Sequence, residues 1–428
     1  MKRTVDSKEH LEKITKIFTI CVLLFPILTI YATPIPQISF GEIVLFSLML
    51  VMSADMACRR RSIKWNPFWC YLFYALCISI AASIILLLVR ADFSYTDMMQ
   101  RVLRDGFYFA IVLVFGAWYF DFDYGKKIIR LISIVFGLFM ILQVAAYAAV
   151  HVYVPGVIPQ LETTISGGFT GAELTERFAL TASVDGYARA SGFFSEPAVA
   201  AHFMTVALLL ELFPENQKVN YKLAGFYSTA MLLTFSVNAY VAILGCWGLW
   251  AVYSDKYRKN DVIRIVFFAF AFCVIAVFAM RSNAIAGVVN RLIELKNGGR
   301  TEGSSVIRVV RGMAFYLKMP LFCQLFGSGF GNFIQFREIF AITTVYETAD
   351  EYMNTNAYIL VSSGAVGLLL FIGSLLRNTK GKIVFARMLL ILLFIFGLSS
   401  SIYSSAQFVI MLLFIMYAPP EKGRIYEN

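Results

Sequence analysis

The sequence is poor in charged residues. Only 15% of its 428 residues are Asp, Glu, Lys or Arg, whereas 59% are hydrophobic. Soluble globular domains carry about 25% charged residues, so this composition excludes an ordinary water-soluble fold. The chain also lacks a long linker, a low-complexity segment and a convincing internal repeat. We therefore expect a single transmembrane domain over residues 1–428.

Residue types that build metal and disulfide sites are scarce. The three histidines, His10, His151 and His202, lie far apart in the sequence, which argues against a zinc site. Most of the seven cysteines lie inside apolar runs, and only Cys323 falls in a predicted external loop, so we expect no disulfide. No segment is typical of a strand, so no nucleotide-binding glycine motif follows one.

Apolar runs fill most of the chain. They are about 17 to 22 residues long, which is enough to cross a hydrocarbon core of about 30 Å. They predict an all-α, polytopic integral membrane protein with about twelve transmembrane helices. A mixed-charge stretch precedes the first run and further runs follow at once, so it is not a cleaved signal peptide. The predicted spans are 17–34, 40–57, 68–89, 106–120, 131–152, 198–214, 222–236, 238–254, 264–280, 353–376, 383–400 and 402–418.

The short loops orient these spans. Seven lysine-containing basic clusters fall on one side of the membrane if both termini are cytoplasmic: 2–16, 59–64, 126–130, 218–222, 256–264, 377–382 and 422–424. The net charge of +10 then follows from the positive-inside rule, and no nucleic-acid partner is implied. We expect a tight turn near 236–238, because a single helix over 222–254 would reverse everything after it.

Two large loops therefore face away from the cytoplasm, 153–197 and 281–352, with a shorter one near 90–105. Their cations are mostly arginines, whereas only Lys296 and Lys318 are lysines. Arginine suits forked recognition of phosphate or carboxylate, although it also snorkels at membrane interfaces. The arginines are Arg90, Arg101, Arg104, Arg177, Arg189, Arg281, Arg291, Arg300, Arg308, Arg311 and Arg337.

The first large loop ends in the run RASGFFSEP at 189–197. Ser195, Glu196 and Pro197 are typical of a helix start, and the positive end of that helix favours an anion. Two interpretations of Glu196 stay open: an ionised general base, or a residue that only caps its helix. His202, about two turns further on, is more typical of a packed helix residue than of a proton shuttle.

The second large loop contains a predicted amphipathic helix at 304–318. Ser304, Arg308, Arg311 and Lys318 fall on one face, while Val306, Val309, Val310, Met313 and Leu317 point largely elsewhere. Such a basic stripe either holds a lipid pyrophosphate or anchors the segment to anionic headgroups. The run GSGFGN at 327–332 follows, and its alternating glycines permit tight turns and close backbone approach.

A competing motif lies at Asp121-Phe122-Asp123. It resembles the two-aspartate metal site of many nucleotide-sugar transferases. However, it falls on the predicted cytoplasmic side, in a loop too short to build a nucleotide-sugar pocket. We therefore predict no metal site and no cofactor.

Three motifs together carry a family resemblance. SGFFSEP before a span, the arginine-containing run that ends in GSGFGN, and TNAYILVSSGAVGLL at the start of the tenth span resemble the O-antigen polymerases of Gram-negative bacteria. That family belongs with the wider O-antigen ligase and polymerase group of lipid-sugar transferases. The likeness covers the whole topology, whereas the matching motifs cover few residues.

The resemblance implies a metal-independent glycosyl transfer at the periplasmic face of the bacterial inner membrane. A glycan would move from undecaprenyl pyrophosphate to the terminal sugar of a lipid-linked repeat unit. A flippase and a separate chain-length regulator are the partners that the resemblance implies. Glu196 is the expected base, while Arg189, Arg308 and Arg311 are the expected cations at the departing pyrophosphate. Arg291 is a weaker candidate for the leaving group, Ser195 is expected to contact substrate, and Asn332 and Asn356 either orient sugar hydroxyls or cap local structure.

Two other functions stay open. An O-antigen ligase typically has a histidine before the Asn that opens the late span, but this chain has Thr355 before Asn356. A flippase of the lipid-linked units would have short loops and charges within its spans, whereas these spans are nearly free of charge apart from Glu42. Both features favour a polymerase. One feature departs from the polymerase pattern, since four residues separate the SEP triplet from His202.

Overall fold

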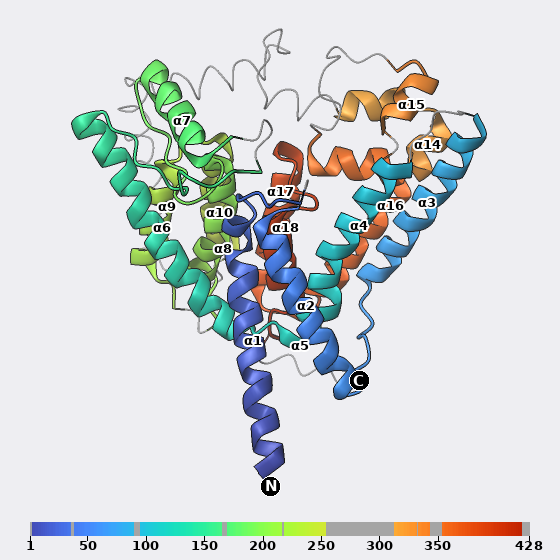
Figure 1. Ribbon diagram of the computed structural model, residues 1–428, viewed down its shortest axis with the longest axis horizontal. Coiled ribbons are helices and arrows are strands. Elements are labelled where there is room, and N and C mark those ends of the chain that lie inside the picture. Colours follow the sequence, from blue (N-terminus) through green and yellow to red (C-terminus); the bar gives the residue numbers. More distant parts are fainter. Residues whose placement is uncertain are drawn as a thin grey trace. The chain divides into compact units, whose positions relative to one another are not determined.

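The computed structural model describes residues 2–35, 38–89, 95–164, 169–215, 218–253, 312–331, 333–342 and 353–421. Helices are the regular elements of these ranges, as Figure 1 shows. A few isolated β-bridges pair residues of the connecting segments. This confirms the all-α prediction. The chain forms two compact units: unit 1 comprises Met1–Leu50 and Asp123–Ile293, and unit 2 comprises Val51–Phe122 and Glu294–Asn428.

Five helices are long and apolar enough to cross a membrane: Phe40–Cys58, Phe68–Val89, Met98–Tyr119, Phe122–Val150 and Thr355–Thr379. Four shorter apolar helices accompany them: Pro197–Leu212, Val237–Tyr253, Val384–Ser399 and Ala406–Met416. The protein therefore has the helices of a membrane protein. The total of twelve spans stays a prediction, and the ninth, 264–280, lies outside the described residues.

Unit 1 is built around a buried helix. Its helices are α1 (Lys2–Leu28), α6 (Phe122–Val150), α7 (Gly171–Asp185), α8 (Pro197–Leu212), α9 (Tyr221–Leu232) and α10 (Val237–Tyr253). Almost every side chain of α8 is buried, since the helix is apolar on all sides and packs against α9 and α10. Glu211, near its last residue, is the acidic exception and is only 2% exposed.

Glu211 is paired with an arginine of α6. The guanidinium of Arg130 donates from Nε to Glu211 Oε1 at 2.6 Å and from Nη2 to Oε2 at 3.0 Å. The backbone carbonyl of Arg130 also accepts a hydrogen bond from the Tyr227 hydroxyl at 3.2 Å. Such forked ion pairs are stronger than single hydrogen bonds. This cluster therefore ties α6, α8 and α9 together.

The break expected in 222–254 is confirmed, although it lies at 233–236 and the expected 237–238 already belong to the next helix. Helix α9 ends at Leu232, α10 begins at Val237, and Phe235 between them has a left-handed φ of 45°. The 12 residues of α9 rise about 18 Å, which is less than the hydrocarbon thickness of about 30 Å. The segment therefore forms a helix hairpin whose first arm is short.

Helix α7 was not predicted. It lies inside the first large loop and is labelled in Figure 1. It packs on the end of α6 through Tyr147, Ala182 and Phe178. A capping box starts it: the Thr170 side chain accepts from Glu173 N, and Glu173 Oε2 accepts from Thr170 N at 2.7 Å. These hydrogen bonds hold the pKa of Glu173 below its ordinary value. The first large loop therefore contains a packed helix and is not a simple connection.

Unit 2 contains α3 (Phe68–Val89), α4 (Tyr95–Ala110), the π-helix η1 (Ile111–Phe115), α5 (Gly116–Tyr119), α14 (Leu321–Phe326), α15 (Phe333–Ile339), α16 (Thr355–Thr379), α17 (Val384–Ser399) and α18 (Ala406–Met416). Helix α2 (Phe40–Cys58) begins in unit 1 and ends in unit 2. Helix α4, η1 and α5 follow one another without a break, so helix replaces much of the loop predicted near 90–105.

The glycine run 327–331 is hydrogen-bonded to a break in α16. Gly364 interrupts that helix with φ 69° and ψ −176°, a conformation that is essentially restricted to glycine. The break frees carbonyl groups, which accept hydrogen bonds from the glycine run: Ser328 N donates to Val361 O at 2.9 Å and Gly329 N to Ser362 O at 2.8 Å. Gly327, with φ 94°, passes so close that a Cβ atom would lie 2.3 Å from Ser362 O.

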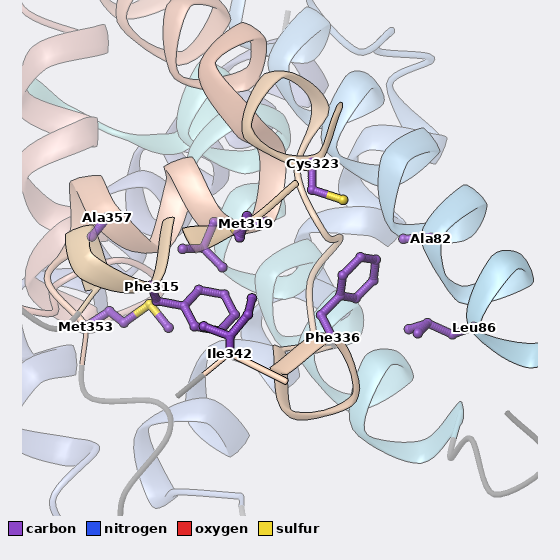
Figure 2. Close-up of a cluster of buried hydrophobic side chains, with 10 residues drawn as sticks. Ala82, Leu86, Phe315, Met319, Cys323, Phe336, Ile342, Met353 and Ala357 are labelled. Atoms are coloured by element: carbon purple, nitrogen blue, oxygen red, sulfur yellow. The ribbon is translucent and has the colours of Figure 1, made fainter. Parts of the chain in front are cut away.

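The segments around the glycine run pack on α3 and α16. Phe315, Met319, Cys323 and Phe336 are buried together with Ala82 and Leu86 of α3 and with Met353, Ala357 and Val361 at the start of α16 (Figure 2). Residues 312–318 are helical, with Met313 and Leu317 exposed. The end of the predicted amphipathic helix is therefore present, while 304–311 lies outside the described residues.

We expect Gly364→Ala to lower the free energy of unfolding by about 3 kcal/mol or more, because it adds strain and a backbone clash. The new Cβ atom would lie 2.3 Å from Leu325 O. Thermal unfolding of the purified protein in detergent measures the effect. Gly373→Ala is the matched control, since its Cβ atom would meet nothing within 4 Å in the same helix. Equal stability of both variants would contradict the role of the break.

We expect Glu211→Gln to lower the free energy of unfolding by about 1–3 kcal/mol, because Arg130 loses a charged, forked acceptor. Solvent screening limits the loss, since the Arg130 side chain is 41% exposed. Glu215→Gln is the control: Glu215 lies 3.8 Å from Lys126, and its side chain is 28% exposed. Chemical denaturation in mixed micelles should separate the two, and a larger loss in the control would refute this assignment.

Candidate functional site

Residues 186–196 form a loop in unit 1, here called the motif loop. The side-chain amide of Gln143 in α6 joins this loop to the segment after α6: Nε2 donates to Val154 O at 2.9 Å, and Oε1 accepts from Gly192 N at 3.0 Å. Gly192 has φ 62°, and Gly156 lies so close that a Cβ atom there would be 1.7 Å from Gly192 O. The left-handed φ favours glycine at position 192 of SGFFSEP, and the close backbone approach requires glycine at position 156.

The two phenylalanines of the motif are packing residues. The Phe193 ring stacks on Phe139 of α6 with centroids 4.3 Å apart, and Phe194 contacts Phe136 at 5.0 Å and Phe203 of α8 at 5.2 Å. Phe194 is 1% exposed. Buried aromatic pairs of this kind stabilise by their area and by ring geometry. They fix the loop between α6 and α8. The candidate functional residues of the loop are therefore those on either side of them, Arg189 and Glu196.

The motif loop also contacts the turn between α9 and α10. Ala190 N donates to Leu233 O at 3.1 Å, and the Tyr187 and Phe235 rings pack with centroids 4.9 Å apart. The turn and the loop therefore lie at the same end of unit 1. The predicted topology requires this, because it places both on the external side.

Glu196 occupies the N-cap position of α8. Its backbone is extended, its carbonyl accepts from Val199 N at 3.1 Å and Ala200 N at 3.3 Å, and Pro197 begins the helix as expected. However, its side chain is exposed and makes no capping hydrogen bond. A side-chain cap, one of the two interpretations of this residue, is therefore absent. The carboxylate lies at the N-terminal end of α8.

Arg189 lies at the other end of the loop, beside tyrosines. It is half-buried, and its charge acts on the Tyr153 and Tyr240 hydroxyl groups. The Tyr153 hydroxyl lies 3.5 Å from Ser191 Oγ. Burial raises the pKa of Tyr153, while this hydrogen bond and the Arg189 charge oppose the rise. The Tyr153 hydroxyl thus stays neutral beside the Arg189 guanidinium. Ser195, at the other end of the loop next to Glu196, is half-buried.

Asn356 does not cap a helix. Asn354 is the N-cap of α16 and accepts from Ala357 N at 2.8 Å. Asn356 Nδ2 instead donates to Phe394 O of α17 at 3.3 Å, and Gly397 leaves space for it. This contact joins two helices, so the expected sugar contact is not needed to explain the residue. Four other predicted residues, Arg291, Arg308, Arg311 and Asn332, lie outside the described part of the chain.

Thr355 organises the loop between α17 and α18. Its Oγ1 donates to Ser400 O at 3.0 Å and accepts from Ile402 N at 2.8 Å and Tyr403 N at 3.1 Å. The residue is 2% exposed. A hydroxyl that both donates and accepts suits this position. The place where ligases typically have a histidine is thus occupied here by a buried structural threonine.

A buried carboxyl in unit 2 escaped the sequence analysis. Asp105 of α4 is 6% exposed, Oδ1 accepts a hydrogen bond from Ser404 Oγ, and Oδ2 is buried without a hydrogen-bond partner among the described residues. Ser404 has φ 54°, a strained value for serine. Arg101 and Arg104 act on the carboxylate through their charges. An acid inside an apolar helix could have identified Asp105 from the sequence. It was missed because the predicted span began at 106, whereas the apolar helix is Met98–Tyr119.

Aromatic residues of the sequence motifs gather near Asp105. Tyr403, next to Ser404, packs on Phe330 of the glycine run and on Tyr358 of the TNAY motif, with ring centroids 5.9 and 5.3 Å apart. Arg101 lies 5.4 Å from the Tyr358 ring centre, within range of a cation–π interaction. The two late motifs thus meet around an acid that belongs to neither.

The competing aspartate motif has a local explanation. Asp123 lies in the first turn of α6, and its Oδ1 accepts from Lys126 Nζ at 3.3 Å. An acid in the first turn and a following lysine stabilise a helix start. The motif therefore needs no metal to account for Asp123.

Comparison with known proteins gives no match, either to a protein-family model or to an individual curated protein.

We expect Asp105→Asn to leave the free energy of unfolding within about 1 kcal/mol of the parent, or to raise it. The amide keeps an acceptor for Ser404 and removes a buried carboxylate, whose desolvation is costly. Thermal unfolding in detergent provides the measurement, with Ser404→Ala as the control for the hydrogen bond. A loss of more than about 3 kcal/mol would instead identify Asp105 as a structural acid.

Proposed function

We propose that the protein is an O-antigen polymerase-like enzyme of the bacterial inner membrane. It joins undecaprenyl-pyrophosphate-linked repeat units at the periplasmic face, with both termini in the cytoplasm. The resemblance of three motifs supports this proposal, and the apolar helices are consistent with it. The observation that carries it furthest is the exposed Glu196 carboxylate, which makes no capping bond at the start of α8.

The proposed reaction has one nucleophile and one leaving group. The hydroxyl of the terminal sugar attacks the anomeric carbon of the donor glycan, and a new glycosidic C–O bond forms. The C–O bond to undecaprenyl pyrophosphate breaks, and its electron pair leaves with the phosphate oxygen. Glu196 accepts the hydroxyl proton and later releases it to water. A general base of this kind contributes about 10²- to 10⁴-fold in rate.

Arginines complete the proposal on the leaving-group side. Arg189 is held on the motif loop, which Gln143 and the Phe193 and Phe194 rings fix in place. A positioned guanidinium stabilises the negative charge that develops on pyrophosphate. Arg291, Arg308 and Arg311 are proposed to act with it, and Asn332 to contact sugar. A flippase that supplies repeat units and a chain-length regulator are the proposed partners.

The alternatives gain less support from the described residues. The buried hydrogen bonds of Thr355 argue against a ligase that uses a histidine at this position. One finding favours a transporter: the apolar helix Met98–Tyr119 contains the buried Asp105, although the spans were expected to be nearly free of charge. A charged residue within a span is typical of transporters. Helix α7, which packs against the motif loop through Ala182 and Ala188, nevertheless favours an enzyme.

The test is lipopolysaccharide banding in cells that lack the gene. We expect core plus a single repeat unit in the deletion strain, and a full ladder on complementation with the parent gene. Glu196→Gln should lose the ladder at normal expression, because it removes the base with little change in size. Glu176→Gln should restore it, because Glu176 is an exposed glutamate of α7.

The same assay separates the arginines and the alternatives. Arg189→Gln should lose the ladder, whereas Arg177→Gln, on exposed α7, should keep it. Core alone with accumulated lipid-linked polymer would indicate a ligase. An unchanged ladder in the deletion strain would refute glycosyl transfer altogether.

A further inference from the structure

The loop between α2 and α3 combines cations with exposed apolar side chains. Its sequence, RRRSIKWN at 59–66, is here called the basic loop, and it lies entirely in unit 2. Neither the proposed reaction nor the three motifs use it. Its construction, charge and exposure together indicate a ligand.

Hydrogen bonds fix the backbone of the basic loop. The indole Nε1 of Trp118, at the end of α5, donates to Ser62 O at 3.2 Å, and Lys64 Nζ donates to Ala117 O at 3.1 Å. Asp55 Oδ1 accepts from Arg59 Nε at 2.6 Å, and its Oδ2 accepts from the Tyr119 hydroxyl at 2.7 Å. The loop is therefore a built surface and not a loose connection.

Aromatic rings hold two of its cations. The Arg61 guanidinium carbon lies 4.8 Å from the Trp118 ring centre, and Lys64 Nζ lies 3.9 Å from it. Cation–π contacts orient these groups without neutralising them. Asp55, the acid closest along the chain, is already paired with Arg59. Arg60, with φ 51°, adds an exposed cation.

The end of α16 extends this charged surface. Asn66 and Asn378 exchange two amide hydrogen bonds, with N–O distances of 3.0 and 2.9 Å. The pair brings the basic loop beside the last turn of α16, where Arg377 and Lys380 are exposed. Cations from two distant parts of the sequence are thus gathered at one end of unit 2.

Two apolar side chains project from the same loop. Trp65 is 76% exposed and Ile63 is 59% exposed. Tryptophan is enriched at membrane–water interfaces, where its ring lies at headgroup level. Clusters of Lys and Arg beside a membrane helix attract anionic headgroups. A soluble phosphate compound would satisfy the cations but leave both apolar side chains in water.

We propose that the basic loop and the end of α16 bind the phosphodiester headgroups of anionic phospholipids. In this arrangement Arg60, Arg61 and Lys64 contact the phosphate, while Trp65 and Ile63 insert at the boundary between headgroups and acyl chains. The site is independent of the proposed reaction. It fixes the depth and tilt of unit 2 in one leaflet.

Quenching of tryptophan fluorescence tests the proposal. The full-length protein is placed in phosphatidylcholine nanodiscs that contain a minor fraction of brominated phosphatidylglycerol or, in a parallel sample, of brominated phosphatidylcholine. The signal of Trp65 is the difference between the parent and Trp65→Phe. We expect at least about threefold stronger quenching of Trp65 by the brominated anionic lipid, since each cation near the surface adds attraction.

Charge variants identify the groups responsible. The triple variant Arg60→Gln, Arg61→Gln, Lys64→Gln should lose the preference for the anionic lipid, and Arg60→Gln alone should reduce it. Arg177→Gln, an exposed arginine of unit 1, should retain it in full. If the triple variant does not fold, Arg60→Gln decides the case, because Arg60 is exposed and lies outside the Trp118 contacts.

Two results would overturn the proposal. Equal quenching of Trp65 by the two brominated lipids in the parent would show that no anionic headgroup is selected. Loss of the preference on addition of inorganic phosphate would show a general phosphate site and not a lipid site.

Discussion

The satisfaction of backbone hydrogen bonds away from water governs this structure. In a hydrocarbon environment each unpaired N–H or C=O group costs several kcal/mol, so a break in a helix must find new partners. The break at Gly364 obtains them from Ser328 and Gly329 of the glycine run. The wide turn of η1 obtains one from Tyr417, whose hydroxyl donates to Val112 O at 2.7 Å. Lys382 donates to the carbonyls of Ile415 and Met416 at the end of α18, and burial lowers its pKa to about 8.

The same requirement shapes the motif loop. Gln143 satisfies two backbone groups of neighbouring loop segments, and the Phe193 and Phe194 rings fill the space between α6 and α8. Most of SGFFSEP is therefore structural. Arg189 and Glu196, on either side of these packing residues, keep positions set by the rigid part. In the proposed reaction a rigid loop would favour the role of Glu196 as a base, because misplacement of a catalytic group by about 1 Å is costly in rate.

Several features could be predicted from local sequence. The start of α8 at Pro197 and the separation of α9 from α10 follow from capping residues and from charge placement. Helix α7 was missed although Thr170 and Glu173 have the spacing of a capping box. The signal was overlooked because a long polar loop was expected. The start of α4 was also placed too late, since Arg101, Arg104 and Asp105 lower the hydropathy of a continuous helix.

The sequence by itself determined the membrane-protein class and most helix positions, because runs of apolar residues depend on local composition. Only the tertiary structure decided what individual polar groups do. It showed that Glu196 makes no capping bond, that Asn356 joins α16 to α17, and that Asp105 is buried against Ser404. The partner of Asn356 lies 38 residues away in the sequence, and that of Asp105 lies 299 residues away. A side chain's hydrogen bonds are fixed by which helices pack together, and local pattern does not encode that choice.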